Sequence, residues 1–132
     1  MGRLAYVDSS AYVKLPLEEE GDGALREELA DWHGYVSSEL LGVEAIRACA
    51  RYGAPYAQDA REWLLDVSLL PLDDAVLGVA AMLQPAGLRS LDAIHLATAL
   101  TVREEIGAFI AYDDRLAAAA GDHRLPVVQP GA

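Results

Sequence analysis

Lysine, cysteine and long apolar runs are scarce in this sequence. The one lysine, Lys14, lies near the start. This placement excludes a receiver-type phosphoacceptor domain, which needs a lysine after a late strand, and no GxxxxGK[ST] loop suggests a nucleotide site. The single cysteine, Cys49, cannot form an internal disulfide and lies among apolar residues, as expected for a core position.

Charged residues also interrupt the apolar segments. Every apolar run ends well before the roughly 20 residues of a membrane span, and Asp8 breaks the first run too early for a signal peptide. We therefore expect a protein of the reducing cytoplasm with no membrane contact.

Basic residues are few relative to acidic ones. The chain has 10 Lys and Arg against 21 Asp and Glu, a net charge of −11, so its surface repels nucleic acid at long range and attracts cations or a basic partner. With 132 residues, 53% of them hydrophobic, it is long enough to bury one core. We expect a single domain over residues 1–132.

Short apolar runs alternate with helical patterns along the whole chain, which is typical of an α/β fold with a parallel sheet covered on both faces. The expected strands are Leu4–Val7, Tyr35–Val36, Ser68–Leu70, Ala108–Ala111 and Pro126–Val128. The expected helices are Leu25–Trp32, Glu39–Tyr52, Tyr56–Val67, Asp73–Leu83, Ser90–Arg103 and Asp114–Ala120. Tyr52 and the apolar face of Tyr56–Val67 belong either to the core or to a dimer or partner surface.

Four acids occupy positions that such a fold brings together. Asp8 and Asp113 each follow an expected strand, at the edge where open α/β sheets bind ligands. Glu44 stands in the apolar helical stretch LLGVEAIRA, three residues before Arg47. Asp92 opens the helix SLDAIHLATAL, with His95 on the same face.

Each acid also has a structural explanation. Asp92 suits a helix N-terminus, with Ser90 as N-cap, and Asp8 and Asp113 suit caps of their own. Glu44 can pair with Arg47 on an exposed edge. Asp73 and Asp74 have the same capping pattern without any further feature, so they serve as controls.

Taken together, YVDSSAYVKL, VSSELLGVEAIRA, LDAIHLATAL and AYDDRL resemble the spaced acids of the PIN domain, in particular VapC-type ribonuclease toxins of toxin–antitoxin pairs. The resemblance covers nearly the whole chain. It implies a PIN-like three-layer fold, with a central parallel sheet flanked by helices on both faces. It also implies a Mg²⁺- or Mn²⁺-dependent endoribonuclease, a basic antitoxin partner and a homodimer. One departure is Ala111, where the family often has Thr or Ser.

The chemistry of the acids agrees with a hard cation. Two carboxylates about 6 Å apart repel by roughly 3 kcal/mol at an effective dielectric of about 20, and oxygen ligands suit Mg²⁺. We expect Asp8 and Asp92 to be the main ligands, with Glu44 and Asp113 binding through water or completing a second site. Whether Asp114 joins them is open.

Other residues are expected to support the acids. Ser10 is a candidate for holding a ligand or a substrate phosphate, and His95 for packing beside the site. Arg47, Arg89 and Arg115 are candidate phosphate contacts. The expected reaction is hydrolysis of single-stranded or loop RNA by metal-activated water. The alternative is a non-catalytic module of the same fold that binds a basic protein through its acidic face.

Overall fold

A five-stranded parallel sheet forms the centre of the chain in the computed structural model, which describes residues 2–132. The strands are β1 (Leu4–Val7), β2 (Gly34–Ser38), β3 (Val67–Leu70), β4 (Ile106–Ile110) and β5 (Val127–Val128), in the spatial order β3-β2-β1-β4-β5. The chain builds the sheet outward from β1 in one direction and then returns to its other side with β4. The carboxyl ends of β1 and β4 therefore meet at the point where the strand order reverses.

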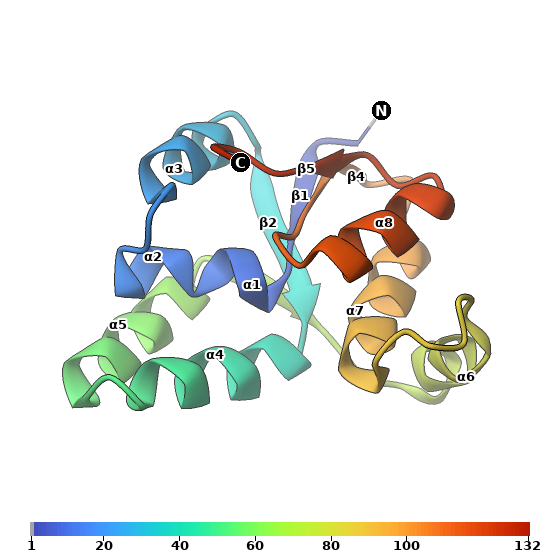
Figure 1. Cartoon of the computed structure of the whole chain (residues 1–132), viewed down its shortest axis with the longest axis horizontal. Coiled ribbons are helices and arrows are strands. Elements are labelled where there is room, and N and C mark those ends of the chain that lie inside the picture. Colours follow the sequence, from blue (N-terminus) through green and yellow to red (C-terminus); the bar gives the residue numbers. More distant parts are fainter. Residues whose placement is uncertain (1) are drawn as a thin grey trace.

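Helices cover the two faces of the sheet unequally (Figure 1). One layer contains α1 (Ser9–Tyr12), α2 (Lys14–Leu17), α3 (Asp22–Ala30), α4 (Leu40–Ala50) and α5 (Ala54–Leu64). The other contains α7 (Ser90–Thr101) and α8 (Asp114–Asp122), with α6 (Asp74–Met82) packed outside α7. Sheet and helices thus form the three layers that the resemblance to the PIN domain implies.

Alternation along β1 divides the core into two parts. Ala5 and Val7 pack with the first helical layer, whereas Tyr6 packs with α7 and α8. Cys49 is fully buried in the first cluster, as expected. Both sheet faces are covered because the central strands carry apolar side chains on both sides.

The sequence predicts every strand, and the predicted boundaries differ from the observed ones by one or two residues at several strand ends. The predicted helix Tyr56–Val67 instead spans Ala54–Leu64, because Val67 begins β3. The short helices α1 and α2 lie outside the predicted ranges, since four-residue turns are too short to show a helical period. No helix within residues 2–132 is long and apolar enough to cross a membrane.

Candidate active site

All four predicted acids line one pocket of about 320 Å³ at the carboxyl edge of the sheet. They come from four places: the end of β1, the middle of α4, the first turn of α7 and the end of β4. Neighbouring small residues complete the wall. The pocket is lined by Asp8, Ser9, Ser10, Val13, Glu44, Ala48, Asp92 and Asp113.

Asp8 is held in place by the turn that follows β1. It is buried and caps α1, with its Oδ2 accepting from the Ser10 backbone N–H at 3.1 Å and from the Ser10 hydroxyl at 2.6 Å. The same hydroxyl accepts from the backbone N–H of Tyr112 at 2.9 Å. Ser10 therefore ties the end of β1 to the segment after β4, although Ala111 itself offers no hydroxyl. Both of these hydrogen-bond partners of the Ser10 hydroxyl are groups of the protein, not a ligand or a phosphate.

Glu44 reaches the site through His95. The His95 ring is fully buried, with Nε2 2.6 Å from Glu44 Oε1 and Nδ1 2.7 Å from the Tyr6 hydroxyl. A carboxylate only accepts, so Nε2 donates to Glu44; in the neutral ring Nδ1 then accepts from Tyr6. A continuous chain of hydrogen bonds thus runs from the buried strand β1 to α4.

The charges around His95 favour its protonated form. Burial lowers the pKa of the imidazole, but the hydrogen bond to Glu44 and the negative charges of Asp8, Glu44 and Asp92 raise that pKa by more. His95 Nε2 also lies 3.6 Å from Asp8 Oδ1. His95 consequently links two of the four acids.

Arg89 links the other two acids. Its Nε lies 3.6 Å from Asp92 Oδ2, and its Nη2 donates to Asp113 Oδ2 at 3.1 Å. Burial and the charges of Asp113 and Asp8 raise the pKa of the Asp92 carboxyl, while Arg89 opposes that rise. Asp113 also caps α8, because its Oδ1 accepts from the Leu116 backbone N–H. The site therefore concentrates negative charge and partly compensates it with the Arg89 guanidinium.

The donor set suits a hard divalent cation. Asp8 Oδ1 and Asp92 Oδ2 are buried and lack a hydrogen-bond partner, an expensive arrangement for carboxylate oxygens unless a cation binds them. Within residues 2–132, however, no three acidic, histidine or cysteine side chains are already arranged around one ion position. Glu44 is turned to His95 and Asp113 to Arg89, so binding by all four requires side-chain rotation.

Several supporting residues differ from expectation. Ser90 is the first helical residue of α7 and Arg89 takes the N-cap position, so the predicted Ser90 cap is wrong. The alternative pairing of Glu44 with Arg47 does not form: Glu44 binds His95 of α7, and Arg47 is exposed. Arg115 and Asp114 are exposed too, and neither lines the acidic pocket.

Sequence reasoning missed Tyr6 and the Tyr112 backbone. Tyr6 looks like an ordinary apolar strand residue, and only its position one residue from Val7, on the α7 face, brings it to His95. The Tyr112 contact is made by the main-chain N–H, a group that almost every residue type carries, so the residue type does not predict it. Neither signal is available before the sheet order is known.

Comparison with known proteins adds a family assignment to this geometry. The model of the PIN domain matches residues 5–122. The chain belongs to the PIN domain family. It is 40% identical to Ribonuclease VapC47 of Mycobacterium tuberculosis over 98% of both chains.

Two solved structures share the PIN fold at low sequence identity. The crystal structure of VapC20 from Mycobacterium tuberculosis, a toxin that cleaves the sarcin–ricin loop, matches with a TM-score of 0.72 and 18% identity over 87% of this chain and 94% of that one. A toxin–antitoxin complex from Klebsiella pneumoniae matches with a TM-score of 0.71 and 20% identity over 96% and 97%. The architecture around the acids is thus that of PIN-fold proteins.

Proposed function

We propose that this protein is a Mg²⁺- or Mn²⁺-dependent endoribonuclease, the toxin of a toxin–antitoxin pair, which cleaves single-stranded or loop RNA. The observation that carries the proposal is the convergence of Asp8, Glu44, Asp92 and Asp113 on one pocket. Full-length similarity to a protein named a ribonuclease supports the activity. The two structural neighbours, a loop-cleaving toxin and a toxin–antitoxin complex, agree with the biological class.

Asp8 and Asp92 would hold the cation, since each has a buried oxygen without a hydrogen-bond partner. Bound there, Mg²⁺ or Mn²⁺ would lower the pKa of water and stabilise charge on a phosphodiester. Ser10 fixes the second oxygen of Asp8, which leaves the first free to bind. His95 positions Glu44 through its Nε2, and Asp113 completes the acidic wall.

The charge of the protein limits which RNA it can bind. With a net charge of −11, it cannot neutralise many phosphates, so it must hold a short segment near the acidic pocket. The backbone of an unpaired loop can be splayed into such a pocket, whereas the backbone of a duplex is held in its helix and cannot enter it. We therefore expect selective cutting of structured RNA at loops and poor activity on duplex DNA.

Analysis of the cleavage products tests the proposed reaction. Attack by water leaves a 5′-phosphate and a 3′-hydroxyl, which mass spectrometry of the fragments identifies. Cleavage should stop in EDTA and in Asp92→Asn. A 2′,3′-cyclic phosphate, or cleavage that persists under both conditions, would contradict metal-dependent hydrolysis.

The antitoxin is expected to be basic and to place an arginine among the four acids. A guanidinium forms paired, charge-assisted hydrogen bonds with carboxylates, and the pocket already binds one such group in Arg89. Co-expression should suppress toxicity. A complex that forms equally well when all four acids are neutralised, and that keeps full nuclease activity, would rule out inhibition by site occupation.

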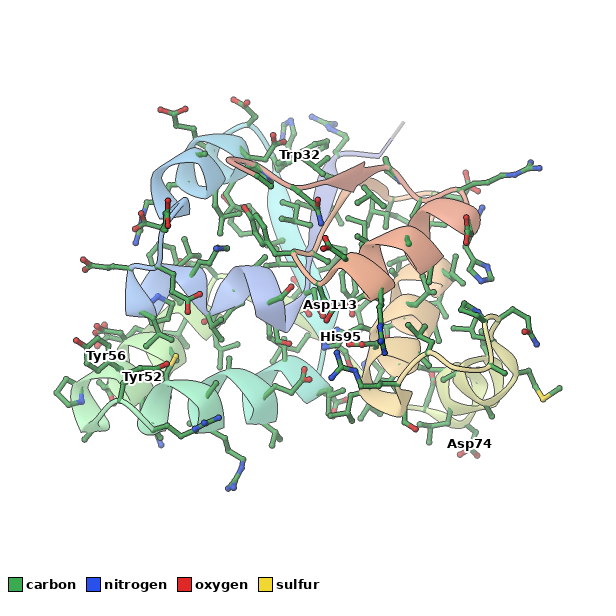
Figure 2. The ribbon with its side chains drawn as sticks, viewed as in Figure 1. Trp32, Tyr52, Tyr56, Asp74, His95 and Asp113 are labelled. Carbon is green, nitrogen blue, oxygen red and sulfur yellow. The ribbon has the colours of Figure 1, made fainter. Side chains whose placement is uncertain are left out.

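A homodimer is the expected oligomeric state. Tyr52, in the turn between α4 and α5, and Tyr56, in α5, are exposed and contact each other edge to face, with ring centroids 6.4 Å apart (Figure 2). Exposed aromatic side chains are typical of protein interfaces. Light scattering during gel filtration tests this; a monomer at micromolar concentration would contradict it.

A non-catalytic interaction module is the second candidate. The observation that favours it is the pairing of Asp92 and Asp113 with the Arg89 guanidinium, a group that a basic protein partner would also supply. A calorimetric metal titration separates the two functions. The module should bind a basic protein without binding Mn²⁺, whereas the nuclease should bind Mn²⁺ on its own.

A further inference from the structure

Arg89 occupies an unusual place for a cation. It is the N-cap residue of α7, where the helix dipole favours negative groups and disfavours positive ones. Its side chain makes no capping hydrogen bond and is 67% exposed. The guanidinium therefore does not cap the helix, and its contacts are with two aspartates of the acidic pocket.

The guanidinium bridges two separate parts of the chain at this edge of the sheet. It contacts Asp92 from the first turn of α7 and Asp113 from the end of β4, using different nitrogens for each. Asp92 Oδ2, which Arg89 approaches at 3.6 Å, is one of the two buried oxygens without a hydrogen-bond partner. Arg89 thus compensates the charge of this oxygen without donating a hydrogen bond to it.

We propose that Arg89 is an internal counter-ion, which lies between Asp92 and Asp113 when no metal is bound and is displaced when a divalent cation binds. The exposed side chain can swing outward without disturbing packed neighbours, whereas the two carboxylates stay on their fixed elements. Once displaced, the guanidinium is free to contact an RNA phosphate. Metal would then bind before RNA. This proposal rests on the metal site of the proposed function.

Two substitutions at this position separate its possible roles. Arg89→Gln removes the charge and the bridge, whereas Arg89→Lys keeps the charge but lacks the planar fork that contacts both acids. Arg115→Gln is the matched control, because it makes the same charge change next to Asp114 and Arg115 forms no ion pair among residues 2–132. It reports the effect of net charge alone.

Calorimetric titration of the RNA-free protein with Mn²⁺ gives the deciding measurement. Exposed ion pairs are weak, so we expect Arg89→Gln to bind Mn²⁺ about two- to fivefold more tightly than wild type, with Arg89→Lys in between and Arg115→Gln close to wild type. With RNA as substrate, Arg89→Gln should also raise KM more than it lowers kcat.

The outcomes distinguish this inference from the proposed function. If wild type binds Mn²⁺ and Arg89→Gln binds it equally or more weakly, Arg89 does not compete with the metal, and only the present inference fails. If Arg115→Gln tightens binding as much as Arg89→Gln, the effect is one of net charge and the bridge is irrelevant. If wild type and Arg89→Gln both fail to bind Mn²⁺ at millimolar concentration, the metal site fails and the counter-ion inference fails with it.

Discussion

Two helices of this protein begin with the same pair of residues and have different surroundings. Asp73 and Asp74 start α6, and Asp113 and Asp114 start α8. The capping geometry is nearly the same: Asp73 Oδ1 accepts from the Val76 N–H at 2.9 Å, and Asp113 Oδ1 accepts from the Leu116 N–H at 3.0 Å.

The difference lies in the strand that precedes each helix. β3 is an edge strand, so Asp73 and Asp74 emerge at the periphery, whereas β4 pairs with β1 and delivers Asp113 beside Asp8. Figure 2 shows Asp113 near His95, between the two helical layers, and Asp74 at the outer margin of α6. Identical local chemistry therefore becomes part of an acidic pocket only where the sheet order brings other acids to it.

The largest expected difference between the two helix starts is in RNA cleavage. Asn caps a helix as well as Asp does, so Asp→Asn at either N-cap removes a charge without unfolding the first turn. Asp113→Asn should lower kcat/KM about 10- to 100-fold because it weakens the acidic site, while Asp73→Asn should stay within about twofold of wild type. Fragment assays on a structured RNA measure both; equal losses would remove the distinction between the two starts.

Metal-dependent stability gives the next largest difference. At ten times its Kd, a cation that binds only the folded state stabilises it by about 1.4 kcal/mol, or about 3–6 °C in Tm for a domain of this size. Mg²⁺ or Mn²⁺ should produce this gain in wild type and in Asp73→Asn, and much less of it in Asp8→Asn or Asp113→Asn. Calorimetric melting with and without millimolar metal provides the measurement.

A wild-type protein whose Tm does not respond to millimolar metal would contradict the shared site. A response that survives in Asp8→Asn would instead place the bound cation elsewhere in the chain. Loss of the response in Asp73→Asn would mean that the control is unsuitable.

The sequence predicts the alternation of strands and helices and the convergence of the four acids, because both follow from residue types and their spacing along the chain. Asp8 and Asp113 are predictable as strand-end acids, and their pocket follows once the strands are parallel. The pairing of Glu44 with His95 is not predictable in this way, since Arg47 is three residues from Glu44 in sequence and His95 is 51 residues away. Local spacing favours Arg47, whereas His95 lies on α7 in the other helical layer, so only the tertiary fold brings it to Glu44.

Removing the cap itself should reveal a smaller difference between the helix starts. Asp73→Ala loses one capping hydrogen bond, worth about 1 kcal/mol of unfolding free energy. Asp113→Ala loses the same cap, but it also relieves repulsion with Asp92, whose pKa is raised by burial and then by the charge of Asp113. Urea unfolding in EDTA should therefore show a smaller loss for Asp113→Ala than for Asp73→Ala. A larger loss for Asp113→Ala would mean that its contact with Arg89 outweighs the repulsion.

The smallest expected effect concerns the second aspartate of each pair. Asp74 and Asp114 are exposed in the first turns of α6 and α8, where a negative charge interacts with the helix dipole and is worth about 0.3–1 kcal/mol at low salt. Asp74→Asn and Asp114→Asn should therefore cause similar small losses in urea unfolding, and both losses should shrink as salt screens the charge. Neither substitution should change the metal-dependent gain in Tm, because Asp114 does not line the acidic pocket. If Asp114→Asn alone abolished that gain, the site would include both aspartates of the AYDDRL motif, and the two helix starts would differ at two positions instead of one.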